Sequence, residues 1–191
     1  MEIKWRHDID QVLKDAKTER KPVLLDFSAA PTGSGCARLD AEVYPDERVA
    51  RFIAEHFIPA RVHVREQAAD FKRFGERYGA QWTPTILELD PDGMEQHRVE
   101  GFLETPEFLA QLKLGLGKSA FKAKQWQDAE RQFREVVDRF GQSDAAAEAL
   151  YWAGVSRYKA TGDANALKET AAAFGSRYSG STWAKKASIW K

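Results

Sequence analysis

The stretch Leu24-Leu25-Asp26-Phe27-Ser28-Ala29, followed by a short loop and then by Cys36-Ala37-Arg38-Leu39, decides how this chain folds. Its apolar residues run continuously instead of alternating with polar ones, which is typical of a strand buried on both faces of a sheet. The small-residue loop 29–35 then leads into a helical pattern that extends to about His56. Pro and Asp within residues 44–46 interrupt this pattern, and both favour the start of a new helix. We therefore expect a buried strand, a loop and a broken helix.

The other segments of residues 1–117 alternate between helical and strand patterns. The Pro-Asp-Gly sequence within Asp90–Gly93 predicts a turn that joins two strands into a hairpin. The further elements expected are helices at 9–16, 67–78 and 105–114, and strands at 57–64, 85–89 and 95–101. A parallel βαβ unit followed by an antiparallel hairpin predicts an α/β domain over residues 1–117, with a mixed sheet and helices on both faces.

This arrangement resembles the thioredoxin superfamily, in which a buried strand and a loop lead into the helix that carries the active-site cysteines. A second point of resemblance is Trp82-Thr83-Pro84-Thr85-Ile86, which enters a strand with Pro84 at the family's cis-proline position. The similarity covers roughly residues 1–116 and implies a thioredoxin-like fold. In this family the cis-proline shapes a groove where extended peptide pairs with backbone, so Trp82, Thr83 and Pro84 are the expected peptide-groove residues.

The cysteine content departs from the family's Trp-Cys-x-x-Cys pattern, because Cys36 is the chain's one cysteine. The resemblance places Cys36 at the second, resolving position and Gly33 at the first, attacking position. Ser34 and Gly35 complete the active-site-loop equivalents, the loop is one residue longer, and the preceding Trp is missing. A single cysteine excludes an intrachain disulfide and a dithiol cycle carried by this chain alone.

Two interpretations of Cys36 stay open at this point. The resolving position of the fold is usually shielded, which favours a small buried residue packed under the loop. The other interpretation is a monothiol that forms mixed disulfides or is capped by glutathione, with the helix macrodipole favouring the thiolate. Asp26 resembles the family's buried carboxylate that supports proton transfer. Without a disulfide to serve, Asp26 is equally well explained as a hydrogen-bonded structural acid.

Residues 118–191 carry helical signals alone and contain an internal repeat. The segment 138–152 aligns with 176–190 at an offset of 38 residues, with an Arg, an aromatic residue, a Ser, two Ala and a Trp kept. A fixed offset of this size predicts stacked helical hairpins and resembles tetratricopeptide repeats, which implies peptide or helix binding. The alternative is that this unit buries a side of the first domain or pairs two copies of the chain as a homodimer.

The composition excludes several classes of function. Lys+Arg 29 against Asp+Glu 29 gives a net charge of zero, which argues against a nucleic-acid binder. The four histidines lie in separate elements without ligand spacing, so we expect neither a metal site nor a cofactor. No uncharged run approaches the ~18 residues of a membrane span, and the N-terminus lacks the apolar region of a signal peptide. A soluble cytoplasmic protein without membrane contact is the default expectation, unless a leader has been removed.

Two further patterns are given structural interpretations. Gly115–Ser119 ends like a phosphate loop but lacks the first glycine and follows a helix, so we interpret it as a helix stop and interdomain link. Four arginines are assigned to solvated surfaces: Arg48, Arg51, Arg61 and Arg65.

The function expected from these observations is the binding of protein or peptide partners through the Pro84 groove and the helical repeats, with a chaperone-like role implied by resemblance. The alternative is a monothiol thiol-disulfide oxidoreductase that acts through Cys36 with an external thiol. A third hypothesis is that the protein is a scaffold subunit whose two domains, 1–117 and 118–191, only dock a partner.

Overall fold

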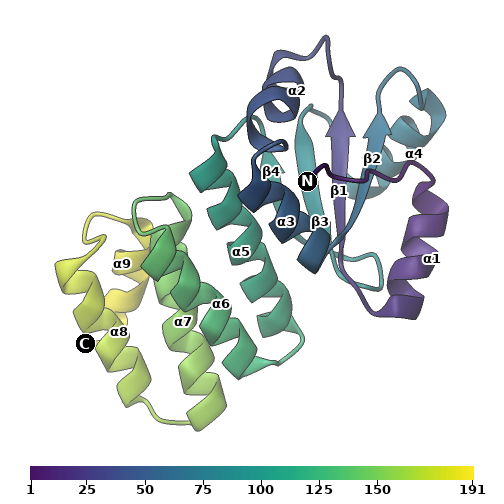
Figure 1. Ribbon diagram of the computed structural model, residues 1–191. Helices are drawn as coiled ribbons and strands as arrows, with labels where there is room; N and C mark the ends of the chain where they lie inside the picture. The colour runs from purple at the N-terminus through teal and green to yellow at the C-terminus, as the bar shows by residue number, and fades with distance from the viewer. The chain divides into compact units, whose positions relative to one another are not determined.

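A four-stranded mixed sheet forms the centre of the first half of the computed structural model, which describes residues 1–191 (Figure 1). The strands are β1 (Val23–Ser28), β2 (Ile58–His63), β3 (Thr85–Leu89) and β4 (Glu95–Glu100), in the order β2-β1-β3-β4. β1 runs parallel to β2, whereas β3 is antiparallel to both β1 and β4. The mixed sheet predicted from the sequence is therefore confirmed.

Helices cover both faces of this sheet. On one face, α1 (Ile9–Glu19) and α4 (Ala68–Tyr78) contribute Val12 and Phe74 to a core shared with the strands. α2 (Ser34–Arg38), a π-helical turn η1 (Leu39–Val43) and α3 (Glu47–His56) follow β1. The helical pattern predicted from Cys36 onward thus divides into three pieces. The predicted break near residues 44–46 is confirmed, since the Asp46 side chain accepts the N–H of Arg48 at 2.9 Å as the N-cap of α3.

All six residues of β1 are buried, which explains their continuous apolar pattern. An unexpected feature is that the N-terminal residues extend the sheet beyond β2. Arg6 pairs with Ala60 in a parallel bridge, and its N–H donates to the Pro59 carbonyl at 3.0 Å. The outer edge of β2 is therefore covered by the chain's own N-terminal segment.

The structure divides into two compact units, residues 1–108 and 109–191. The helices of the second part are α5 (Thr105–Lys122), α6 (Trp126–Arg139), α7 (Ala145–Thr161), α8 (Asn165–Ser176), α9 (Thr182–Ala187) and a final 3-10 turn η2 (Ser188–Trp190). None of the chain's helices combines the length and the apolar character needed to span a bilayer. The division at 108/109 falls inside α5 and before the boundary predicted at 117/118.

The prediction that Gly115–Ser119 stops a helix and links two domains is wrong, because α5 continues through this segment to Lys122. Packing explains the glycine at 117. A Cβ atom there would lie 2.5 Å from the ring of Phe133, which α6 contributes to the core of the second unit. Gly117 therefore permits two helices to approach closely and does not break α5.

Two turns between helices, 38 positions apart in the chain, make the same hydrogen bonds. Ser143 donates its backbone N–H and its hydroxyl to the Phe140 carbonyl, at 2.9 and 2.6 Å. Ser181 makes the same two bonds to the Tyr178 carbonyl, at 2.9 and 2.7 Å. The two turns thus share one hydrogen-bonding pattern, while the assignment of these hairpins to tetratricopeptide repeats stays a prediction.

The contact between Gly154 and Thr170 gives a test of the packing of the second unit. A Cβ at Gly154 of α7 would lie 2.0 Å from the hydroxyl oxygen of Thr170 in α8. We expect Gly154→Ala to lower the free energy of unfolding by about 1–3 kcal/mol through overpacking. Urea unfolding followed by Trp fluorescence measures this change. Gly175→Ala is the matched control, since a Cβ there meets nothing within 4 Å, and it should stabilise by about 0.5–1 kcal/mol. Equal effects at the two positions would contradict close packing of α7 and α8.

Candidate functional site

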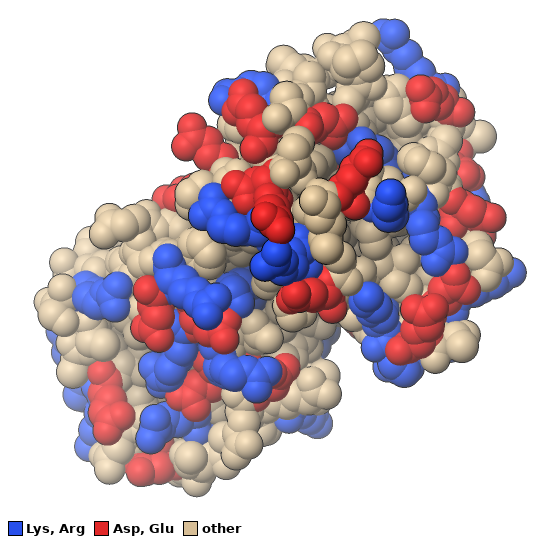
Figure 2. Space-filling view, viewed as in Figure 1, with Lys and Arg blue, Asp and Glu red and all other residues tan.

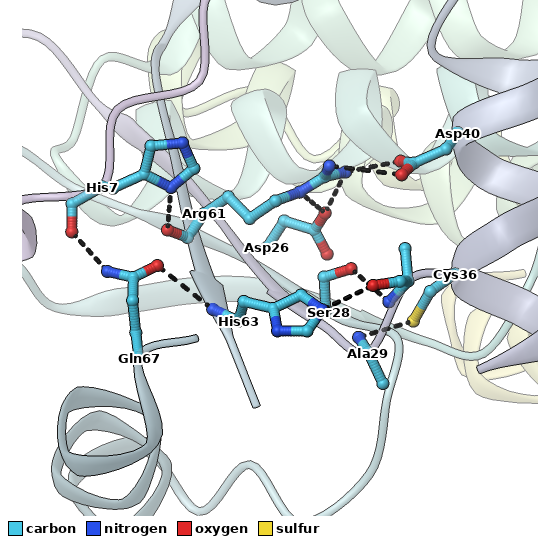
Figure 3. Close-up of polar contacts among 10 residues, drawn as sticks. His7, Asp26, Ser28, Ala29, Cys36, Asp40, Arg61, His63 and Gln67 are labelled. Carbon is cyan, nitrogen blue, oxygen red and sulfur yellow. Dashed lines mark hydrogen bonds and ion pairs between the residues drawn. The ribbon is translucent and has the colours of Figure 1, made fainter. Parts of the chain in front are cut away.

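The chain's single thiol lies at the start of the helix that follows β1. α2 begins at Ser34 with Gly33 as its N-cap, so Cys36 sits in the first turn. The side chain of Cys36 is only 2% exposed. Its Sγ accepts the backbone N–H of Ala29 at 3.3 Å (Figure 3). The thiol is therefore held inside the protein by the loop that precedes the helix.

The two glycines of this loop make close contacts. A Cβ on Gly33 would lie 3.6 Å from the Cys36 Sγ and 3.1 Å from the Cβ of Ala29. This places position 33 beside the thiol, where the attacking cysteine of the resemblance would stand. A Cβ on Gly35 would lie 3.0 Å from the Cδ of Pro84, so the start of α2 rests against the proline.

The Thr83–Pro84 peptide bond is cis, as the resemblance to the thioredoxin superfamily implies. A second cis bond, Ala30–Pro31, lies in the loop and was not anticipated. Trp82 is 67% exposed, whereas Pro84 is buried. No hydrogen bond of the structure uses the backbone N–H or carbonyl of Thr83. An exposed aromatic ring and a free peptide unit therefore lie next to the cis-proline.

Asp26 lies under this region as part of a buried ion cluster. Its Oδ2 accepts the Arg61 Nε–H at 2.9 Å, and Arg61 also donates from Nη2 and Nη1 to the two oxygens of Asp40, at 2.7 and 3.3 Å (Figure 3). The rings of Trp5 and Tyr44 lie 4.6 and 5.4 Å from the guanidinium carbon. This cluster links β1, β2, η1 and the N-terminal segment.

The assignment of Arg61 to a solvated surface is wrong, since its side chain is only 15% exposed. The sheet register explains the difference, because Asp26 and Arg61 are direct partners across the parallel strands. From the sequence alone, Arg61 resembles the arginines Arg48, Arg51 and Arg65. The one signal that could have found it was an arginine in an otherwise apolar strand next to a strand that carries a buried acid.

Burial and charge act against each other on the Asp26 carboxyl. Loss of hydration raises its pKa, and the adjacent Arg61 guanidinium opposes that rise without cancelling it. Burial also raises the pKa of Tyr44, and the nearby Asp26 charge adds to the rise. The ion cluster therefore carries a hydration cost that Arg61 offsets in part.

The histidines and the phosphate-loop-like segment add no side chain to this ion cluster. His63 ends β2 beside the loop, and His7 contacts the carbonyl of Arg61 at 3.2 Å. No group of three or more His, Cys, Asp or Glu side chains is arranged to hold a metal ion. The phosphate-loop-like residues Gly115–Ser119 lie within a helix, where their backbone N–H groups form no cradle.

A family model described as a thioredoxin-like domain matches residues 9–115, more than half of the chain. The chain belongs to the thioredoxin-like family. No curated protein matches it. The remainder of the chain is helical, and the fold of the family is one that thiol-disulfide proteins use.

Solved structures show the same fold. A putative disulphide-isomerase from Bacteroides thetaiotaomicron has a TM-score of 0.52 and 28% identity, covering 60% of this chain and 93% of that one. A thioredoxin from Thermus thermophilus has a TM-score of 0.50 and 25% identity, covering 59% and 86%. The DsbH oxidoreductase has a TM-score of 0.55 and 16% identity, covering 61% and 85%, and is similar in fold alone. The thioredoxin-like fold of the first unit is therefore confirmed.

The ion cluster predicts a pH-dependent effect of removing Arg61. The pKa of Asp26 is higher in the folded protein than its ordinary value of 3.8, so its stability contribution is present at low pH and is lost as the pH rises through the folded pKa. Arg61→Met raises that pKa further. We expect it to lower the stability of β1 by about 3–5 kcal/mol near pH 8 and by less near pH 5. Hydrogen exchange of residues 23–28, measured by mass spectrometry, reads this change.

The control for this experiment is the double variant Arg61→Met with Asp26→Asn. It should recover most of the loss near pH 8, because the uncompensated carboxylate is gone. A loss that is equal at both pH values, and that Asp26→Asn leaves in place, would mean that Arg61 acts by packing alone.

Proposed function

We propose that the protein binds an extended polypeptide segment at the Pro84 groove and performs no dithiol chemistry there. The observation that carries this proposal is the state of the former redox site. Gly33 stands beside Cys36 where an attacking thiol would be needed, and Cys36 itself is buried. A nucleophile must reach its substrate as a thiolate, and a shielded lone thiol does not meet that requirement.

The groove keeps the features that binding needs. The free backbone of Thr83 supplies one donor and one acceptor for pairing with an extended chain, in the manner of strand addition. Trp82 offers a large exposed ring next to it. Aromatic side chains of this kind supply much of the energy in protein interfaces.

In this proposal the helical unit is a second binding surface for a protein partner. The role is chaperone-like when that partner is an unfolded chain. On the face drawn in Figure 2, basic and acidic side chains are interspersed over each unit. A mixed surface of this kind suits a polypeptide partner better than a polyanion. Pairing of two copies through the helical unit is the competing use of that surface.

The second candidate function is a monothiol oxidoreductase. Its supporting observation is the position of Cys36 in the first turn of α2, directly beside the loop that follows β1. In this reaction the Cys36 thiolate attacks a substrate disulfide, a mixed disulfide forms and one substrate thiolate leaves. A glutathione thiolate then attacks the mixed disulfide, which releases Cys36 and leaves glutathione bound to the substrate sulfur.

Binding at the groove is tested with carboxymethylated α-lactalbumin, an unfolded chain whose blocked cysteines exclude thiol chemistry. We expect Trp82→Ala to weaken its binding about tenfold, since a central Trp often dominates an interface. Fluorescence anisotropy of the labelled chain measures the affinity. Met94→Ala is the matched control, because Met94 is similarly exposed, at 60%, but lies in the β3–β4 turn. Equal losses in both variants, or no binding by the wild type, would contradict the proposal.

The missing nucleophile can be restored by Gly33→Cys. Position 33 has extended backbone angles that a cysteine adopts, and its Cβ would lie 3.6 Å from the Cys36 Sγ. We expect the two thiols to form a disulfide and the variant to reduce insulin with dithiothreitol, whereas the wild type does not. Adding Cys36→Ser to the variant should abolish this activity. Turnover by the wild type with glutathione as the only thiol would instead favour the monothiol reaction.

A further inference from the structure

His63 makes a set of hydrogen bonds that defines where its ring proton lies. The backbone N–H groups of Arg65 and Glu66 both approach Nδ1, at 3.1 and 3.3 Å. Because an N–H only donates, Nδ1 must be the acceptor and the proton must sit on Nε2. Nε2 lies 2.5 Å from the carbonyl oxygen of Ala30 and therefore donates to it.

Ala30 belongs to the loop that covers the thiol. The neighbouring Ala29 donates its N–H to the Cys36 Sγ, and its carbonyl accepts the N–H of Gly33 at 2.8 Å and the hydroxyl of Thr32 at 3.0 Å. The other hydrogen bonds of residues 29–33 reach no further along the chain than Ser28 on one side and Ala37 on the other. The bond to His63 is thus the one that ties this loop to a distant segment.

The imidazole extends from the end of β2 (Figure 3). His63 is the last residue of β2 and pairs with Ser28, the last residue of β1. Its backbone N–H donates to the Gln67 side chain at 3.3 Å, and Gln67 donates to the His7 carbonyl at 2.8 Å. Parallel strands end at the same edge of a sheet, so the ring extends from the end of β2 to the loop that leaves β1.

We propose that His63 is the positioning residue that holds the 29–33 loop closed over Cys36 and, through Gly33 at the end of that loop, fixes the start of α2 against Pro84. The bond from Nε2 to the Ala30 carbonyl anchors the loop to the end of β2, and the two N–H groups that donate to Nδ1 set the tautomer that makes this bond. Closure over Cys36 does not depend on the proposed peptide binding. The effect on the groove rests on that proposed function.

Two amide substitutions separate the two sides of the ring. His63→Gln keeps a donor near the Nε2 position, whereas His63→Asn keeps an acceptor near Nδ1 and loses the donor to Ala30. The rate of reaction of Cys36 with Ellman's reagent in native buffer reports loop opening, because the chain has one cysteine. We expect His63→Asn to raise this rate about tenfold, and His63→Gln to stay within about threefold of the wild type, since the partly buried hydrogen bond to Ala30 is lost in the first variant alone.

Controls distinguish positioning from general destabilisation. His7→Asn alters a histidine of the same network that makes no bond to the loop, so it should leave the Cys36 rate unchanged. Urea unfolding of each variant shows whether the rate follows global stability. The proposal is overturned if the order of His63→Gln and His63→Asn is reversed, if neither variant changes the rate, or if the rates only follow the free energy of unfolding.

A measurement on the wild type keeps the test independent of variant folding. The ¹⁵N spectrum of the imidazole should show a protonated Nε2 and an unprotonated Nδ1, and a dominant Nδ1–H form would overturn the proposal. The affinity of the His63→Asn variant for carboxymethylated α-lactalbumin measures separately whether losing this bond changes binding at the groove. A wild type that fails to bind this chain, together with the expected order of Cys36 rates, would reject the peptide-binding function and leave the positioning role of His63 standing.

Discussion

The ion pair between Asp26 and Arg61 is the interaction on which the geometry of the first unit depends. It joins the middle of β1 to β2, and the second pair from Arg61 to Asp40 extends the link to η1. η1 directly continues α2, the helix that carries Cys36. The cluster therefore attaches the start of this helical segment to the sheet beneath it. Charged groups with so little hydration persist because each has an oppositely charged partner at hydrogen-bond distance.

The same region keeps the shape of the thioredoxin-like fold around a single buried thiol. The position beside Cys36 is occupied by Gly33, yet the helix start, the cis-Pro84 contact and the buried acid remain. These parts support one another sterically, since a single added Cβ at position 33 or 35 would meet neighbouring atoms at 3.0–3.1 Å. The peptide binding that we propose next to Pro84 needs only this shape, whereas a dithiol cycle carried by the chain alone needs two accessible cysteine sulfur atoms.

The second unit depends on close approach between helices. Small residues at the contacts allow it, as at Gly117 against Phe133 and at Gly154 against Thr170. The two serine turns with the same hydrogen bonds fix the connections between helices, and the Tyr178 hydroxyl donates to the Gly141 carbonyl at 2.8 Å, which joins one turn to the next. A single pattern used twice thus produces two hairpins that contact each other through their turns.

The sequence by itself determined the features that arise from local chemistry. The continuous apolar run of β1, the Pro-Asp-Gly hairpin turn and the helix restart at Asp46 depend on residues close together in the chain. The tertiary structure alone decided the contacts between distant residues. Arg61 meets Asp26 and His63 meets Ala30 because β1 and β2 lie side by side in register, although 35 and 33 positions separate these residues in the chain. Likewise, a glycine in the sequence favours a helix stop, yet α5 continues through Gly117. The tertiary structure supplies the reason for this glycine, since the ring of Phe133 packs where a side chain at position 117 would lie. Local propensities are encoded within a few residues, whereas these partners are chosen by the packing of the whole sheet and its helices.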